Sequence, residues 1–398
     1  MSPPPHDVRV TTLENLLIPH PRLPRPPSSS FRQSLRASVL PLAAACALAL
    51  IGCKGDEGRV LVVGHRGASA LRPEHTLEAY RKAIEDGADI IEPDLVSTKD
   101  GVLVARHENE ISGTTNVAEV AKFADRKKTK TIDNMQFTGW FTEDFTLAEL
   151  KELRARERIP QQRPGNTQYN DQFEIPTLAE VITLAKDMSA KTGRTIHLYP
   201  ETKHPTYFQS VGLPLEDQLI SDLKANDFSA RKATVYIQSF EVANLKALRE
   251  KIGGSQPNWK LVQLMEDRAR RPYDFTVAGD TRTYGDLMTE AGMKEIATYA
   301  QGVGPAKRSI IDVDSAGNFQ APSDLVRNAH AVDLLVFPYT FRPENAFLTA
   351  PLKAEGPEST RNPAGSVAEI QAYLEAGIDG FFTDDPAVGR QAVDTFKR

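Results

Sequence analysis

The stretch at residues 60–108, VLVVGHRGASALRPEHTLEAYRKAIEDGADIIEPDLVSTKDGVLVARHE, decides the fold class. It begins with an apolar run at residues 60–64, continues with a helical period at residues 76–85, and reaches a second apolar run at residues 89–95. Two strands joined by one helix form a βαβ unit, the unit from which parallel sheets are built. The sequence therefore predicts a parallel sheet.

The same alternation continues along the chain. Further apolar runs rich in Val and Ile lie at residues 195–201, 234–239, 260–265, 300–304, 334–338 and 380–383. Helical periods lie between the runs, at residues 177–188, 216–224, 241–251, 323–331, 366–375 and 387–395. Eight strands joined by right-handed crossovers predict an α/β protein, a (β/α)8 TIM barrel. A doubly wound open sheet is the structural alternative.

One connection, at residues 111–172, is far longer than the roughly 2 to 6 residues usual between a strand and a helix. It contains a short helical pattern at residues 146–154. We expect an inserted subdomain after the second strand, over the mouth of the barrel. Aromatic side chains mostly supply buried area, so its small core is expected to contain Trp140, Phe137, Phe141 and Phe145.

Composition excludes several classes of protein. The chain has 398 residues, with 48 Lys and Arg against 53 Asp and Glu, a net charge of -5. This leaves no basic excess to neutralise a phosphate backbone, so nucleic acid is not an expected partner. Two cysteines provide neither a disulfide framework nor a CxxC zinc site.

The first residues are typical of a processing segment. Residues 1–30 are rich in Pro, and Arg32 and Arg36 precede an apolar run of 15 residues at 37–51, the length of a signal-peptide core. Gly52 and Cys53 follow the run directly, and the end of the run together with them resembles a bacterial lipobox. We expect residues 1–52 to be removed, Cys53 to be lipidated, residues 53–58 to be a linker and residues 59–398 to form the barrel. The alternative is that Cys53 is a small buried side chain.

Polar side chains follow the first three predicted strands. His65 and Arg66 come directly after the first, and Glu92 and Asp94 lie two apart, on one side of the second. Glu201 ends the third strand. In a barrel the carboxyl ends of the strands form the catalytic face.

Glu92 and Asp94 would be costly to keep charged inside a barrel, so a metal, an Arg or a proton must compensate them. With Glu201 they make three carboxylates from neighbouring strands. An oxygen-only set is what Mg or Ca accepts. Lys203 follows the third acid, and His107 is returned toward the same mouth after the turn at Asp100 and Gly101. With no Cys available, the set points away from structural zinc and toward a divalent-assisted phosphoryl reaction.

The stretch from Gly64 to Glu108 resembles the signature of glycerophosphodiester phosphodiesterases, a family of (β/α)8 enzymes. Further strings resemble the periplasmic branch of this family: TTNV from Thr114, DFTLAELKELR from Asp144, IPTLAEV from Ile175, YPETK from Tyr199, QSFE from Gln238, YGDLM from Tyr284, GVGPAK from Gly302, FPYTFR from Phe337 and DGFFTDDP from Asp379. The resemblance extends over residues 60–398.

The resemblance implies a role for each site residue. His65 and His107 would be the general acid and base. One divalent cation, Ca favoured over Mg, would be bound by Glu92, Asp94 and Glu201, and phosphate oxygens would be held by Arg66 and Lys203. The family reaction is thought to proceed through attack by the neighbouring glycerol hydroxyl to give a cyclic phosphate. The residues themselves do not distinguish that route from direct attack by water.

Two positions depart from the family pattern. His75 stands where the family usually has Asn, which raises the question of how the loop before the first helix is ordered. Glu108 stands where the family usually has Asp. This residue would either orient the neighbouring His107 or face water.

We expect a lipid-anchored, extracytoplasmic enzyme that hydrolyses glycerophosphodiesters to sn-glycerol 3-phosphate and an alcohol. Its partners would be this small-molecule substrate and, through the anchor, a membrane, at the periplasmic face of the outer membrane in a Gram-negative host. The alternative within enzymes is a lysophospholipase D or sphingomyelinase D type activity on acylated substrates, which requires a roomy apolar mouth. The alternative of another class is a surface binding lipoprotein with the barrel as scaffold.

Overall fold

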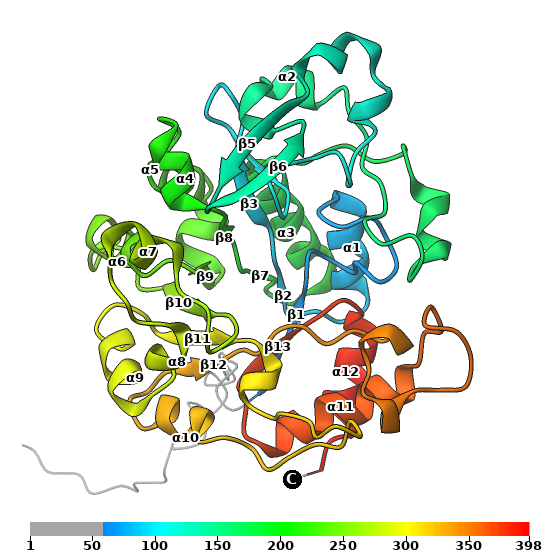
Figure 1. Ribbon diagram of the computed structural model, residues 1–398, viewed down its shortest axis with the longest axis vertical. Helices are drawn as coiled ribbons and strands as arrows, with labels where there is room; N and C mark the ends of the chain where they lie inside the picture. The colour runs from blue at the N-terminus through cyan, green and yellow to red at the C-terminus, as the bar shows by residue number, and fades with distance from the viewer. Residues whose placement is uncertain (1–58, 398) are drawn as a thin grey trace, which may run out of the picture. The chain divides into compact units, whose positions relative to one another are not determined.

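Parallel strands form a closed ring at the centre of the molecule (Figure 1). The computed structural model describes residues 59–397, so the predictions for the leader, Cys53 and the whole linker at residues 53–58 lie outside the described residues. The ring contains β1 (Leu61–Gly64), β2 (Ile90–Ile91), β7 (His197–Leu198), β9 (Val235–Ser239), β10 (Trp259–Met265), β11 (Gly302–Pro305), β12 (Leu335–Val336) and β13 (Gly380–Thr383), each parallel to its neighbour along the ring.

Hydrogen bonds between the last two strands close the ring. Asp379 N donates to Val336 O at 3.1 Å, and Phe382 N donates to Pro338 O at 3.0 Å. The last strand then pairs with the first in parallel register. The predicted (β/α)8 barrel is therefore confirmed, and an open sheet is excluded.

Prolines divide two of the predicted strands. The second runs as β2 and then β3 (Asp94–Ser97), on either side of Pro93, and the third runs as β7 and then β8 (Glu201–Thr202), on either side of Pro200. Proline has no N–H for the ladder, so each strand is interrupted there. The parts that resume, β3 and β8, pair with each other and hold the acidic residues.

Helices surround the ring. Those that the sequence predicts are α1 (Leu77–Glu85), α3 (Leu178–Thr192), α5 (Glu216–Ala225), α6 (Val242–Ile252), α10 (Leu325–His330), α11 (Pro363–Glu375) and α12 (Pro386–Thr395). The sequence did not predict α4 (Pro205–Ser210), α7 (Tyr273–Ala278), α8 (Tyr284–Leu287) or α9 (Glu290–Ile296). The first of these follows β8, and the other three lie between β10 and β11. Within residues 59–397 no helix is long and apolar enough to cross a bilayer.

The core has two layers, which follow from the alternation of side chains along each strand. Leu61 and Val63 point into a small cluster inside the barrel, with Tyr199, Phe337 and other buried residues. Val62, between them, belongs instead to the larger cluster between the strands and the helices. The inside of the barrel is thus filled with side chains and is not a channel.

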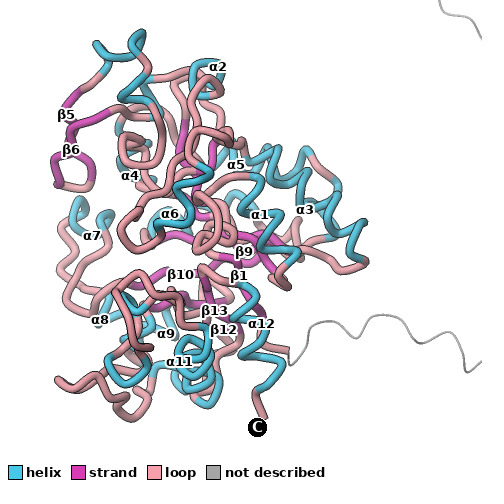
Figure 2. Tube along the Cα trace, turned by 90° about the vertical axis from the view of Figure 1, so that its right-hand side faces the viewer, coloured by secondary structure: helices cyan, strands magenta, loops and turns pink. Residues whose placement is uncertain are grey.

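The 111–172 segment adds no strand to the barrel. The antiparallel pair β4 (Leu103–Ala105) and β3 precedes it, and within it lie the hairpin of β5 (Lys128–Ile132) and β6 (Met135–Gly139) and the single-turn helix α2 (Leu147–Leu150). Figures 1 and 2 show this hairpin standing apart from the ring of strands. The helix α2 is shorter than the pattern at residues 146–154 predicts.

Buried aromatic rings join this segment to the rest of the protein. Trp140, Phe141 and Phe145 are buried in the same cluster that lies outside the barrel strands. The prediction for Phe137 is wrong, because its side chain lies on the exposed hairpin and is 38% exposed. The edge position of β6 leaves that residue without a second layer to pack against.

Candidate active site

The register of three strands brings the acidic residues together at the carboxyl end of the barrel. Asp94 in β3 lies directly opposite Glu201 in β8, which lies opposite Gln238 in β9. Glu92, just before β3, receives hydrogen bonds from the Gln238 side chain at 2.8 Å and from the backbone N–H of Arg66 at 3.0 Å. Backbone pairing therefore places Asp94 and Glu201, and two hydrogen bonds to its side chain hold Glu92.

The three carboxylates form a compact buried cluster. One oxygen from each of Glu92, Asp94 and Glu201 lies within 4.8 Å of the others. Burial raises the pKa of Glu92 well above its usual value, and the neighbouring acids raise it further. Burial also raises the pKa of Glu201, to about 7, although Lys203 opposes the shift. Burial alone would raise the pKa of Asp94 as well, but His75 and Lys203 hold it well below the usual value.

The chemistry of this cluster fits a hard divalent cation. Its donors are carboxylate oxygens, and the Oδ1 atom of Asp94 is buried without a hydrogen-bond partner. Crowded carboxylates that resist ionisation gain a compensating charge when such an ion binds. A cation held here would lie against Glu92, Asp94 and Glu201, the residues that the sequence analysis selected.

His65 leaves the end of β1 and points into the same region. Its Nδ1 atom lies 2.5 Å from Oδ1 of Asp384, and its Nε2 atom lies 4.0 Å from Glu92 and 3.4 Å from the Thr340 hydroxyl. Burial lowers the pKa of His65 to about 4, although the Asp384 carboxylate opposes this shift. The carboxylate fixes the ring by its Nδ1 atom and leaves Nε2 toward the acidic cluster.

His107 has a similar arrangement on the other side of the cluster. Its Nδ1 atom lies 2.5 Å from Oε1 of Glu108, and its Nε2 atom lies 3.3 Å from the Lys203 ammonium. Burial, together with the positive charges of Arg66 and Lys203, lowers the pKa of His107 to about 3. Burial therefore lowers the pKa of both imidazoles, and each ring has a carboxylate partner at the same atom, Nδ1.

Arg66 and Lys203 supply positive charge beside the carboxylates. The Arg66 side chain contacts Glu74 at 3.2 Å and Asp94 at 3.5 Å. Lys203 contacts Glu201 at 2.8 Å, as well as the His107 ring.

The backbone turns sharply next to Arg66 at Gly67, where φ is +89° and an added Cβ would lie 2.5 Å from the Ala79 carbonyl carbon. Glycine is required there for the chain to pass close to α1.

One cavity of about 120 Å³ unites the predicted residues. It is lined by both histidines, Arg66 and all three carboxylates, together with side chains that include Gln238, Phe240, Thr340 and Arg342. Lys203 contacts two of the lining residues. The structure thus brings all seven predicted barrel residues to one place, whereas Cys53 lies outside the described residues.

Comparison with known proteins decides the family. The model of the glycerophosphoryl diester phosphodiesterase family matches residues 65–388. A glycerophosphodiester phosphodiesterase of Arabidopsis thaliana is 36% identical over 337 residues, which cover 81% of this chain and 82% of the relative. The chain belongs to the glycerophosphoryl diester phosphodiesterase family. It is accordingly an enzyme, a phosphoric diester hydrolase.

Other comparisons agree with this family. A glycerophosphodiester phosphodiesterase of Bacillus subtilis is 29% identical, over 82% of this chain and 84% of the relative. A solved structure from Silicibacter pomeroyi has a TM-score of 0.57 at 20% identity, covering 84% of this chain and 93% of its own. A phosphodiesterase from Oleispira antarctica, solved with the product sn-glycerol-3-phosphate, has a TM-score of 0.53 at 17% identity, covering 84% of this chain and 97% of its own. Both structures share the fold.

The two departures from the family pattern have structural explanations. His75 is fully buried, with Nδ1 2.7 Å from the Tyr80 hydroxyl and Nε2 3.0 Å from Oδ2 of Asp94. It therefore orients one of the clustered carboxylates from a left-handed backbone position, with φ of 54°. Glu108 contacts the His107 ring directly, so of the two possibilities it is an orienting partner.

Sequence reasoning missed the charged residues that lie around the histidines. Asp384 follows β13 in the TDDP string, and its position after the last strand was the signal that could have revealed it. Arg158 and Arg163 carried no such signal, because they lie in the long segment at residues 111–172. Arg342, which contacts Asp384 at 3.0 Å, lies in the loop after β12, the seventh strand of the barrel.

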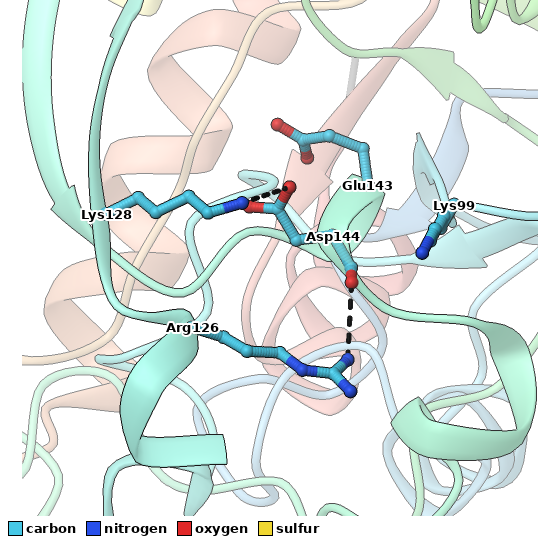
Figure 3. Close-up of a pocket in the computed structure, with 5 residues that line it drawn as sticks. All are labelled: Lys99, Arg126, Lys128, Glu143 and Asp144. Carbon is cyan, nitrogen blue, oxygen red and sulfur yellow. Dashed lines mark hydrogen bonds and ion pairs between the residues drawn. The ribbon is translucent and has the colours of Figure 1, made fainter.

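A separate pocket lies at the base of the β5–β6 hairpin (Figure 3). It is lined by Lys99, Arg126, Lys128, Glu143 and Asp144. Lys128 contacts the Asp144 carboxylate at 3.3 Å, and Arg126 donates to the Asp144 carbonyl at 3.4 Å. Its lining contains no histidine and none of the clustered carboxylates. Arg126 and Glu143 also form ion pairs with residues outside the lining, Glu149 and Lys130. These contacts stabilise the segment.

Proposed function

We propose that this enzyme hydrolyses glycerophosphodiesters to sn-glycerol 3-phosphate and an alcohol. His65 and His107 share the proton transfers, and Glu92, Asp94 and Glu201 hold one divalent cation, with Ca favoured over Mg. Family membership supports the substrate class. The residue roles are supported by the geometry of the cavity.

One observation carries the proposal: two imidazoles, each with a carboxylate on Nδ1, line the same small cavity as three clustered carboxylates. A carboxylate at Nδ1 fixes the tautomer and stabilises the imidazolium when the ring takes a proton. The Nε2 atom of each ring lies on the side of the cavity, beside Lys203 for His107 and beside Thr340 for His65. The site therefore has one Nε2 atom for proton removal and one for proton donation.

The proton balance follows from the chemistry of a phosphodiester. One neutral histidine accepts the proton of the attacking hydroxyl at Nε2, and the other, protonated, donates its Nε2 proton to the leaving alkoxide. Arg66 and Lys203 lie where they would neutralise phosphate oxygens as negative charge develops. When bound, a divalent cation would supply Lewis-acid charge to the same oxygens. Attack by water gives sn-glycerol 3-phosphate directly. Attack by the neighbouring glycerol hydroxyl gives a cyclic phosphate, which water then opens with the two proton transfers reversed.

The size and polarity of the site favour a small polar substrate over an acylated one. The main cavity has a volume of about 120 Å³, and a neighbouring cavity, which shares His65, Arg66 and Arg342 with it, has about 160 Å³. Charged side chains and histidines together make up seven of the thirteen residues that line the main cavity and seven of the ten that line its neighbour. An acyl chain requires a larger apolar volume, as lysophospholipase D or sphingomyelinase D activity would need. A role as a binding scaffold alone gives no reason for two oriented histidines.

Two features outside the site belong to the same proposal. We infer that residues 1–52 direct export and that lipidation of Cys53 anchors the enzyme outside the cytoplasm, at the periplasmic face of an outer membrane where the host has one. The motivation is the apolar run that ends at Gly52 and Cys53. We also infer that the 111–172 segment is an inserted subdomain, because it contributes no strand to the barrel.

The test compares substrates on one preparation of the full chain. With Ca present, we expect release of sn-glycerol 3-phosphate from glycerophosphocholine and glycerophosphoethanolamine. Release of choline from lysophosphatidylcholine should be slower by at least about 10-fold, a difference of about 1.4 kcal/mol in transition-state stabilisation. Faster cleavage of the acylated substrate would support the alternative activity, and no cleavage of either would contradict both.

A further inference from the structure

Two arginines in the 111–172 segment contact the carboxylate partners of the two histidines. Arg158 donates to Glu108 at 2.9 Å and 2.7 Å, and to Glu74 at 2.9 Å and 2.6 Å. It therefore bridges two carboxylates with a single guanidinium. Glu108 is the residue that contacts Nδ1 of His107.

Arg163 makes the equivalent contact on the other side. It donates to Glu344 at 2.7 Å and to the Ser69 carbonyl at 2.9 Å, and it also donates to Oδ2 of Asp384. Asp384 thus presents one oxygen to the His65 ring and the other to this arginine. The Arg163 side chain is almost fully buried, with 6% exposed.

We propose that Arg158 and Arg163 are positioning residues, so that one short loop fixes the geometry of both proton-transferring histidines. The proposal rests on the proposed function of His65 and His107. Neither arginine contacts the carboxylate cluster in the described structure. Each acts on its histidine through one of the carboxylates that it contacts, Arg158 through Glu108 and Arg163 through Asp384.

The loop that carries the arginines is itself held rigidly. Arg163 N donates to the Ile159 carbonyl at 2.9 Å, which closes a turn between the two positions. Glu157 accepts hydrogen bonds from Ile159 N at 2.9 Å and from the Asn166 amide at 2.8 Å, and that amide also donates to the Ser69 carbonyl at 3.1 Å. The spacing of the two guanidinium groups is therefore set by the local backbone.

The choice of arginine agrees with a positioning role. A guanidinium presents five donors in one plane and can hold two carboxylates in fixed orientations, which a lysine ammonium cannot do. The positive charges also keep both carboxylates ionised: burial alone would raise the pKa of Asp384, but Arg163, His65 and Arg342 hold it well below the usual value. An ionised carboxylate is the form that stabilises an imidazolium.

The same segment provides a matched control. Arg156, two residues before Arg158, also forms bidentate ion pairs, with Glu119 at 2.6 Å and with Asp171 at 2.7 Å and 2.8 Å. Neither partner contacts a histidine. Arg156→Gln therefore removes a network of bidentate ion pairs from the same segment and leaves both histidine–carboxylate pairs, His65–Asp384 and His107–Glu108, in place.

The experiment measures kinetics and histidine NMR signals on the full chain, with glycerophosphocholine and Ca as the probes. Arg158→Gln and Arg163→Gln should each lower kcat by about 10-fold or more while KM changes by less than about threefold, because misplaced proton-transfer groups affect the transition state. Arg156→Gln should keep kcat within about twofold. If Arg163→Gln fails to fold, Arg163→Lys is the second variant. It keeps the positive charge but loses the planar set of guanidinium donors, so it should show the same loss of kcat.

The NMR readout separates positioning from a general loss of structure. The downfield Nδ1–H resonances of the two histidines are assigned by their loss in Glu108→Gln and Asp384→Asn. Arg158→Gln should shift the His107 resonance and leave that of His65, and the Arg163 variant should do the reverse.

Three outcomes are decisive. Wild-type kcat in either arginine variant would overturn the proposal for that residue. Equal shifts of both resonances in both variants would show a general structural role. Near-normal turnover in His65→Ala and His107→Ala would instead contradict the proposed function, whatever the arginine variants do.

Discussion

His65 and His107 reach one cavity from different parts of the chain, yet their surroundings are similar. Each ring is held at Nδ1 by a carboxylate at 2.5 Å, and burial is the main reason why each has a lowered pKa. They differ in their neighbours: His107 lies beside the Lys203 ammonium, and His65 lies beside Glu92. The two rings are therefore held in the same way but lie in different electrostatic surroundings.

At the residue scale, His65→Ala and His107→Ala should each lower turnover of glycerophosphocholine by about 100-fold or more, the usual size of a general acid or base contribution. The double variant should be little slower than either single one, since groups that act on one transition state are not additive. Steady-state release of sn-glycerol 3-phosphate measures this. Near-normal turnover in one single variant would remove that histidine from the mechanism.

Glu241, in the loop before α6, offers a prediction about pH. Burial raises its pKa to about 8, with a further contribution from Asp274, while its hydrogen bonds from Thr206 oppose the shift. Between about pH 4.5 and pH 8 the folded protein keeps a proton that the unfolded chain has released. The stability from this group is therefore greatest at low pH and is lost as the pH rises toward 8.

Glu241→Gln should flatten this dependence, because the amide keeps an acceptor for Thr206 and does not ionise. Urea unfolding midpoints at about pH 5 and about pH 9 test it. The wild-type midpoint should fall more than that of the variant across this interval. Glu290→Gln, at an exposed ion pair on α9, is the control and should follow the wild type. Parallel behaviour of Glu241→Gln and the wild type would contradict the prediction.

At the scale of elements, periodicity predicted the parts that repeat. All eight barrel strands and seven of the surrounding helices lie where the apolar pattern put them, because each must bury one side against the other layer. The pattern did not reveal the breaks at Pro93 and Pro200. Contacts between distant segments also left no periodic trace, so Asp384, Arg158 and Arg163 were found only in the structure.

The start of α3 provides a prediction at this scale. The Thr177 side chain accepts a hydrogen bond from Glu180 N, and the Glu180 carboxylate accepts one from Thr177 N at 2.7 Å. These two hydrogen bonds form a capping box. Thr177→Ala should lower the free energy of unfolding by about 1 kcal/mol, measured by urea denaturation.

Thr183 lies in the same helix and serves as the control. Its side chain is exposed and donates only to the Ala179 carbonyl, at 2.8 Å. Alanine has the higher helix propensity, so Thr183→Ala should leave the midpoint unchanged or raise it. Equal losses in the two variants would show that capping is not the cause.

At the scale of the whole molecule, the proposed lipid anchor at Cys53 would determine where the enzyme works. Cys53→Ser should shift the protein from a membrane fraction that requires detergent to a soluble or unprocessed form, because acyl chains provide the membrane affinity. Fractionation of cells that express each form, followed by immunoblotting, measures this. Fractionation identical to that of the wild type would contradict lipidation.

The cation should stabilise the whole barrel as well as the reaction, because its three carboxylates come from two neighbouring strands and the loop before one of them. An ion that binds only the folded state adds about 2.7 kcal/mol when it is present at about 100 times its dissociation constant. Chelated protein should therefore have no diesterase activity and a lower melting temperature, and Ca should restore both more effectively than Mg. Asp94→Asn should lose the thermal shift, since it removes a carboxylate oxygen that lacks another partner, whereas His107→Ala should keep the shift and lose only turnover. Full activity after exhaustive chelation would exclude the cation from the reaction, and an undiminished shift in Asp94→Asn would place the binding site elsewhere.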